Sequence, residues 1–257
     1  MRKLHTIACI AGIALIALSS CGGDDGNASG LDKTIEKYGA KSASPGDGCL
    51  AGYAEKLTDL LTATEAAGQA GKDAASTETK YNKVTKSTAY HECIYKWEGN
   101  GRLMKNVAVK VPQDDIISIG CIETMTEAAF KDRYSEKTEE QIAEMNAVVD
   151  KQMDKALEGN STPEANAAAE KLKKAGISKS TAKNTTKSMT GSFGKILKSY
   201  RPVEGVGDAA AWNEVSEKLH ILNNGVKVEI GVNLSDDTEV NKAKAIEIAR
   251  IVLGKCE

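Results

Sequence analysis

Beyond residue 20 the chain holds two histidines, His91 and His220, and each could in principle do acid–base or metal chemistry. His91 is followed by Glu92, but a zinc-protease motif needs a second histidine four residues further on, and none stands there. On a strand the side chains of His91 and Glu92 would point to opposite faces. His220 lies between Leu219 and Ile221, so we expect an exposed or partly packed ring on the other face. We expect neither histidine to be catalytic.

Two aspartate pairs, Asp114-Asp115 and Asp236-Asp237, could bind calcium. Both precede apolar runs or expected helices, where carboxylates meet free backbone N–H groups, so helix capping is the simpler expectation. The stretch GVGDAA at 205–210 resembles a fragment of a phosphate-binding loop, but it lacks the Lys-Ser/Thr ending and predicts a turn. No serine stands in a G-x-S-x-G motif. The sequence therefore predicts no enzyme, no cofactor and no metal site.

The N-terminus has the pattern of an export signal. Arg2 and Lys3 precede an almost wholly apolar run over 7–18. A helix that spans a bilayer needs about 20 apolar residues, whereas this run is shorter, so it indicates a secretory leader rather than a membrane anchor.

The leader ends in Leu18-Ser19-Ser20-Cys21, which resembles the lipobox of bacterial lipoproteins. That resemblance implies cleavage before Cys21, acylation of this cysteine and durable membrane attachment through several acyl chains. The chain then divides into a signal peptide over 1–20, a flexible tether over 21–46 and a domain over 47–257. Gly22 follows the cysteine where an inner-membrane retention signal would have aspartate, which favours the outer membrane if the cell has two. The alternative is an ordinary secreted protein with an incidental cysteine.

Four further cysteines, Cys49, Cys93, Cys121 and Cys256, remain in the mature chain. An even number of cysteines in an exported protein indicates disulfides, and four cysteines allow three pairings. We prefer Cys49–Cys93 and Cys121–Cys256. A metal site of cysteines with His91 and a thiol nucleophile beside His91 are the alternatives, but no C-x-x-C pair is present.

Charge argues against a nucleic-acid partner. The leader carries two of the 34 basic residues and none of the 36 acidic ones, which leaves the mature chain with a net charge of −4. A nucleic-acid-binding domain would show a basic excess. The length is sufficient for a real core, while the Ala-, Lys-, Glu- and Thr-rich composition indicates many exposed helices.

The spacing of apolar residues separates helices, with steps of three and four, from strands, with steps of two. In the first half we expect a helix over 49–68, a mostly loop segment over 68–88 and a hairpin of strands over 91–99 and 102–112. An apolar run over 114–122 is a strand or a helix start, and helices follow over about 123–200, the second of them capped by Ser135. The C-terminal part is expected to hold a loop over 201–212, a hairpin over 217–234 and a closing helix over 235–255. The closing helix is expected to be capped by Asp236 or Ser235 and to face the sheet with Val240, Ala243, Ile246, Ala249 and Leu253.

One block of the sequence is TDLLTATEAAG with CIYKWEGNGRLMKNVAVKVP, and a second is VEGVGDAAAWNEVSEKLHILNNGVKVEIGV with the closing helix. Together these two blocks resemble small bacterial lipoproteins that have a PsbP-like domain. The resemblance implies an α+β fold, an antiparallel sheet flanked by helices. The family's early cysteine would correspond to Cys49, its Cys-x-Trp-like strand to Cys93 with Tyr95 or Trp97, and its glycine loop to 205–208. The helical stretch of about 131–195 departs from the family and reads as an insertion.

These observations support three hypotheses of different classes. The first is a membrane-tethered, non-enzymatic envelope lipoprotein that binds another protein, with the helical insertion as an arm. The second is a carrier of a small apolar or lipid-like ligand held between the sheet and its helices. The third is a hydrolase built from scattered residues, which the absence of a nucleophile motif disfavours.

Overall fold

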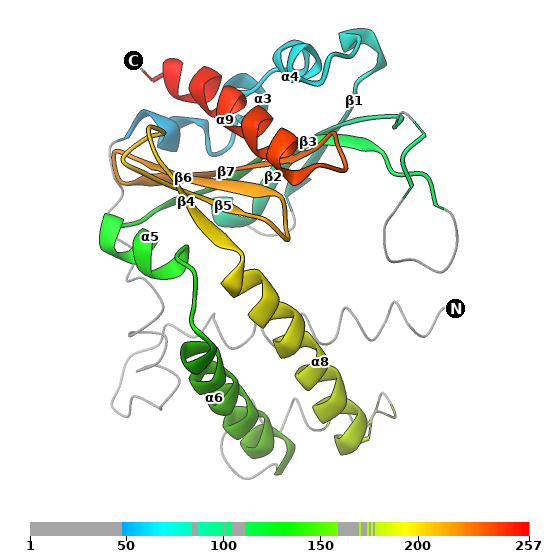
Figure 1. Ribbon diagram of the computed structural model, residues 1–257, viewed down its shortest axis with the longest axis vertical. Coiled ribbons are helices and arrows are strands. Elements are labelled where there is room, and N and C mark those ends of the chain that lie inside the picture. Colours follow the sequence, from blue (N-terminus) through cyan, green and yellow to red (C-terminus); the bar gives the residue numbers. More distant parts are fainter. Residues whose placement is uncertain are drawn as a thin grey trace. The chain divides into compact units, whose positions relative to one another are not determined.

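The chain folds into two compact units, which we describe separately (Figure 1). The computed structural model describes residues 48–83, 87–99, 101–103, 111–158, 170, 174, 176 and 178–256. The sheet unit holds the described residues up to 137 and from 196 onward, and the helical unit those from 138 to 195. Residues 131–137, which we assigned to the insertion, thus belong to the sheet unit.

The expected leader over 1–20 and tether over 21–46, with Cys21, lie outside the described residues. Within the described part of the chain, no helix combines the length and the apolar character that crossing a bilayer requires.

The sheet unit is built on one seven-stranded antiparallel sheet with the order β1-β2-β3-β7-β6-β5-β4. Together with its helices this sheet confirms the α+β class; whether the domain is PsbP-like stays a prediction. The strands are β1 (Glu78–Lys83), β2 (His91–Trp97), β3 (Asp115–Thr124), β4 (Tyr200–Val203), β5 (Ala209–Asn213), β6 (Lys218–Asn223) and β7 (Val226–Asn233).

The C-terminal hairpin of β6 and β7 was predicted correctly. Asn224 and Gly225 form its turn with positive φ values of 50° and 72°. A two-residue turn of this kind matches the right-handed twist of the paired strands, which explains the preference for Asn-Gly. Alternation then sends Leu219, Ile221 and their neighbours on β7 to one face of the sheet.

The predictions were wrong near the edges of the sheet. β1 lies in the segment expected to be mostly loop, and its charged residues suit a strand with only one neighbour. β4 and β5 fall within the expected loop over 201–212; Pro202 lacks a backbone N–H and is tolerated on the edge strand β4. β2 pairs with β1 and β3, so the segment 102–112 is not its partner. Residues 104–110 lie outside the described part of the chain.

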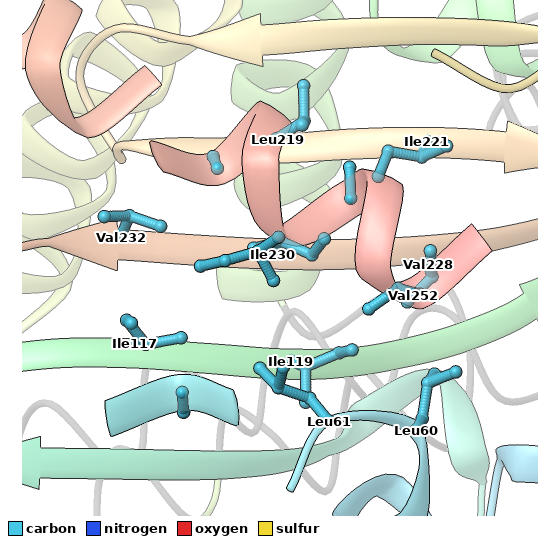
Figure 2. Packing of buried hydrophobic residues seen from close by; sticks show 14 of the residues in the cluster. Leu60, Leu61, Ile117, Ile119, Leu219, Ile221, Val228, Ile230, Val232 and Val252 are labelled. Atoms are coloured by element: carbon cyan, nitrogen blue, oxygen red, sulfur yellow. The ribbon is translucent and has the colours of Figure 1, made fainter. Parts of the chain in front are cut away.

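One face of the sheet, which we call the core face, packs under α9 (Thr238–Gly254), α4 (Ala63–Ala70), α3 (Leu57–Leu60) and the 3-10 turn η1 (Cys49–Tyr53) (Figure 1). Figure 2 shows isoleucines, valines and leucines of the central strands meeting Val252 of α9 and Leu60 and Leu61 from the N-terminal segment. Burying such a side chain contributes about 1.5–3 kcal/mol, so this layer supplies most of the driving force for folding. Its central members are Ile117, Ile119, Leu219, Ile221, Val228, Ile230 and Val232.

The closing helix forms as expected, but it is turned relative to the predicted face. Its buried positions are Asn241, Ala245, Ile248, Ala249 and Val252, while Val240 is 46% exposed. Asn241 sets this rotation, because its Oδ1 accepts the N–H groups of the two residues that follow β7, at 3.0 and 2.9 Å. The cap is Asp237, whose side chain accepts the N–H of Glu239 at 2.9 Å, rather than Asp236 or Ser235.

The single helix expected over 49–68 is broken into η1, α3 and α4. The break comes from Thr62, which caps α4 in a capping box with Glu65: Thr62 Oγ1 accepts the Glu65 N–H at 3.2 Å and Glu65 accepts the Thr62 N–H at 2.7 Å. Leu57, Leu60 and Leu61 are all fully buried on the core side of these pieces.

The structure contains one disulfide, Cys49–Cys256, among the described residues, with the Cα atoms 5.5 Å apart. The two pairs that we preferred, Cys49–Cys93 and Cys121–Cys256, are therefore wrong, and Cys93 and Cys121 are thiols. A bulge in β3 keeps these two apart: the register against β7 shifts after Gly120, and Cys121 has a φ of 53°. Cys93 belongs to the core face, whereas the Sγ of Cys121 lies 3.9 Å from Glu229 on the opposite face.

The helical unit holds α6 (Glu139–Glu158) and most of α8 (Lys179–Lys198). Thr138, not Ser135, caps α6: Thr138 Oγ1 accepts the Gln141 N–H at 3.2 Å and Gln141 Oε1 accepts the Thr138 N–H at 2.9 Å, a capping box. The two helices approach closely where Gly194 faces Ile142, because a Cβ on Gly194 would come within 3.2 Å of the Ile142 side chain. Of the helices expected over about 123–200, the part over 161–176 falls almost wholly outside the described residues.

The cysteine assignment is directly testable. If the protein is alkylated in denaturant without reductant and digested, peptides with Cys93 and Cys121 should carry the label. Peptides with Cys49 and Cys256 should be recovered joined, because their sulfurs are bonded. Recovery of a linked Cys49–Cys93 or Cys121–Cys256 peptide would contradict this pairing.

Candidate functional site

The face of the sheet opposite the core face carries a group of titratable side chains at its centre. Because the apolar residues of β6 and β7 face the core, the residues between them must point the other way. His220 stands opposite Glu229 in the register of these two strands. Lys218, Lys227 and, from β3, Glu123 join them through the ion pairs given below. We call these five residues the polar cluster.

Aromatic rings cover the histidine of this cluster. Tyr134 follows α5 (Glu127–Arg133) and stacks on His220, with the ring centroids 4.3 Å apart and 20° between the planes. Tyr200 of β4 lies 5.6 Å from the same ring. Phe130 supports Tyr134 from within α5 at 4.9 Å. The histidine is 5% exposed, so the pattern indicates a packed side chain rather than the exposed or partly packed one that we expected.

One set of ion pairs connects α5 to the sheet through a shared carboxylate. Glu123 Oε1 lies 3.2 Å from Lys227 Nζ and 3.0 Å from Arg133 Nη1. Lys227 also lies 5.7 Å from the centroid of the Tyr134 ring, within range of a cation–π contact. Glu123 therefore holds the end of α5 onto the polar cluster.

A second set connects three strands. Lys218 forms an ion pair with Glu229 across β6 and β7, and its Nζ lies 3.6 Å from Glu92 on β2. Glu92 thus points to the opposite face from His91, as the alternation predicted. The carboxylate and ammonium groups of the polar cluster satisfy one another.

The surroundings keep Lys227 and Glu229 of the polar cluster charged. Burial opposes the charge on Lys227, but the fields of Tyr134, Glu229 and Glu123 outweigh it and hold the pKa above its usual value. Burial likewise opposes ionisation of Glu229, yet its positive neighbours, His220 when protonated and the two lysines at all times, lower the pKa to about 2.

His220 is neutral at neutral pH. Burial lowers its pKa to about 3, against the attraction of Glu229, and nearby positive groups act in the same direction as burial. Its Nδ1 lies 3.2 Å from Glu229 Oε2 without the alignment of a hydrogen bond, and neither ring nitrogen has a hydrogen-bond partner within the described part of the protein. The ring therefore acts as a stacked aromatic group and not as a general base poised near neutral pH.

Neither free cysteine offers a nucleophile. Burial, helped by the charge of Glu229, raises the pKa of Cys121 to about 11, so its thiolate is scarce at neutral pH. Burial also raises the pKa of Cys93, which is fully covered on the core face. Cys49 is consumed by the disulfide. The cysteine–His91 hypothesis thus finds no reactive thiol in the structure.

His91 lies inside the protein rather than on its surface. Only 2% of the residue is exposed, its ring lies 6.4 Å from that of Tyr81, and its Nδ1 lies 3.7 Å from Glu55. β1, which pairs with β2 on this side, lies in the segment that we expected to be mostly loop.

Asp115 is not a helix cap but a buried member of β3. Its carboxylate pairs with Lys72 at 2.7 Å and with Arg102 at 2.6 Å. Arg102 also donates to the backbone oxygen of Asn233 at 2.9 Å, which fixes the residues near 102 against the end of β7. Asp115 thus has a structural role.

The glycine loop over 205–208 forms the turn that the sequence predicted. Gly207 has a φ of 60°, and a Cβ there would lie 2.4 Å from the Leu222 oxygen. Asp208 Oδ2 accepts the Asn224 N–H at 2.6 Å, so the carboxylate supports the neighbouring hairpin. An open cavity of about 380 Å³ lies beside the loop and is lined by Gly205, Gly207, Asp208, Asn223, Asn224, Arg250, Leu253 and Cys256.

Sequence reasoning missed Lys227, Glu229 and Tyr134 as members of one cluster. A signal was present on β7, where Lys227 and Glu229 alternate with valine and isoleucine. Such alternation predicts the face but not what covers it, and the covering Tyr134 comes from a helix about 90 residues earlier.

Comparison of the chain with protein-family models, curated proteins and solved structures gave no match. Among the residues that the structure describes, no three His, Cys, Asp or Glu side chains are grouped so that they could hold a metal ion. The PsbP-like resemblance therefore stays a prediction.

The buried histidine makes stability depend on pH. In the unfolded chain His220 binds a proton below about pH 6.5, whereas in the folded protein it stays neutral down to about pH 3. The unfolded state thus binds more protons in this window, and stability falls as the pH falls. His220→Phe keeps the stacking ring but cannot bind a proton. Between pH 7 and pH 4.5, the free energy of unfolding should therefore fall by roughly 2–3 kcal/mol more in the wild type than in the variant. Urea titrations at each pH would measure it; parallel curves for the two proteins would contradict the assignment.

Proposed function

We propose that the protein is a lipid-anchored envelope protein whose folded part binds another protein and catalyses no reaction. The observation that carries the proposal is the disulfide Cys49–Cys256, located downstream of a leader that ends in Cys21. Disulfides persist in oxidising compartments outside the cytosol, which agrees with the export that the leader predicts. Gly22 favours an outer membrane as the site of the anchor where the cell has two.

The polar cluster supports an accessory rather than a catalytic role. Its charges are paired with one another, its histidine is neutral and covered by Tyr134, and the nearby thiol of Cys121 has a raised pKa. An active site would present such groups, unpaired, to a substrate. Here they hold α5 to the sheet.

The helical unit is the part we assign to partner binding. It interrupts the sheet unit between two residues that are neighbours in space, since the Lys137 N–H donates to the Leu197 oxygen at 3.0 Å. The sheet therefore does not need the intervening residues to close. An insertion that is dispensable for folding is free to serve as a binding element.

The second candidate, a carrier of an apolar ligand between sheet and helices, finds less support. Side chains of Val228, Ile230 and Val252 fill the space between the core face and α9, and each is fully buried (Figure 2). A ligand there would have to displace well-packed side chains, and overpacking a core is costly.

The lipid anchor is tested by Cys21→Ala in the native host grown with a clickable palmitate analogue. The wild-type protein should carry the label and sediment with membranes, whereas the variant should carry no label because the acylated sulfur is missing. Cys121→Ala serves as the matched control and should label as the wild type. Label on the Cys21→Ala protein would exclude Cys21 as the modified residue.

The binding role is tested by excising residues 138–195 and joining the ends by a short Gly-Ser linker. The sheet unit should keep its near-ultraviolet circular dichroism, which reports the packing of Trp97 and Trp212, because both are buried in that unit. Envelope proteins that crosslink to the intact chain should be lost. If the same proteins are recovered with the excised variant, the helical unit is not the interface.

A further inference from the structure

The lysines of the chain are unevenly placed along the helical unit. Residues 171–195, which we call the lysine segment, contain seven lysines and no acidic residue, although the whole chain has two more acidic than basic residues. α8 includes most of this segment and has no aspartate or glutamate over its 20 residues. α6, its neighbour in the same unit, has the opposite composition, with six acidic residues and two lysines.

Positive charge on the lysine segment is available to a partner. Lys187 and Lys195 are exposed, and neither forms an ion pair within the described part of the chain. Between them along α8 stands Phe193, which is 53% exposed. At 100° per residue, Lys187 and Lys195 lie on one side of α8 and the exposed ring of Phe193 on another. Lysines on a polar face with an aromatic ring on the other are the combination by which helices bind the interface of an anionic bilayer.

We propose that α8 lies against the anionic surface of the membrane to which the chain is anchored. The inference goes beyond protein binding and rests on the anchor at Cys21 from the proposed function. The anchor keeps the surface within reach, because the 27 residues from Cys21 to the first described residue, Gly48, can span at most about 90 Å. This is three times the length of α8, which is about 30 Å.

The positive charge of α8 complements an anionic lipid surface, and it also distinguishes α8 from α6 as the helix that meets this surface. Each lysine near an anionic bilayer strengthens binding by about fivefold, whereas acidic side chains are repelled. The acidic α6 and the basic α8 therefore give this unit one preferred side toward the bilayer. Outside the lysine segment, the chain has nine more acidic than basic residues, so the rest of the protein offers no competing basic excess.

The test uses the full chain, anchored in vesicles, with a tryptophan at position 193. Phe193→Trp reports contact with lipid through quenching by brominated phospholipids. Val215→Trp is the matched control, because Val215 is 56% exposed but belongs to the sheet unit. The native Trp97 and Trp212 are buried and supply the same background in both variants.

In vesicles with 30% phosphatidylglycerol, quenching at position 193 should be at least twice that in pure phosphatidylcholine, and 0.5 M salt should abolish the difference. Quenching at position 215 should be the same in both lipids. The pair Lys187→Gln and Lys195→Gln should weaken docking by about 25-fold. The pair Lys56→Gln and Lys80→Gln, exposed lysines of the sheet unit with the same change in charge, should leave it unchanged.

Absence of quenching at position 193 in anionic vesicles overturns the proposal and leaves the lysine segment to an acidic protein. Equal quenching in neutral vesicles also overturns it, because charge is then not what the helix recognises. The mass of the N-terminal peptide separates the two proposals. An acylated protein without quenching keeps the anchor and loses this inference, whereas quenching of an unacylated protein added to the vesicles keeps the membrane contact and loses the anchor.

Discussion

The pairing of β3 with β7 is the interaction on which the rest of the sheet unit depends. It is the only link in the described sheet between β1–β2 and the four strands from the C-terminal part. About 100 residues, including the whole helical unit, separate the two strands along the chain. Closing so long a loop costs conformational entropy before any contact forms. The isoleucines at the centre of β3, paired with Val232 and Ile230 of β7, supply the apolar burial that offsets this cost.

The two faces of the sheet are stabilised by different interactions, and both fix the same pairing of the strands. The core face relies on apolar burial, which tolerates exchange of similar side chains. The opposite face relies on paired charges under aromatic rings, where a lost partner leaves a buried charge uncompensated. A shift of one residue between β6 and β7 would carry Glu229 toward the core and valines outward, so the polar cluster also fixes the register of the hairpin.

The spacing of apolar and turn residues predicted those elements of the fold whose structure depends on neighbours close in sequence. The hairpin of β6 and β7 has strict alternation around Asn224-Gly225, and α9 has apolar residues at helical spacing, so both elements were found, although the cap and the buried face of α9 were not. β1 is too charged, and β4 and β5 too short or too rich in alanine, to differ from loop in composition. The disulfide was not predictable because the bulge at Cys121 changes its face, and no spacing of residues reports a bulge. The polar cluster was missed for a related reason, since its cover comes from a distant segment.

The disulfide has a mechanical consequence. It joins the first described turn, η1, to the end of the last helix, so a pull on the chain before Cys49 passes through a covalent bond into α9. The load then reaches the core face over the whole contact between α9 and the central strands β6 and β7. Without that bond, the same pull would act on η1, α3 and α4 before it reached the sheet. The covalent link therefore makes the two ends of the described chain share any load through the apolar layer between α9 and the sheet.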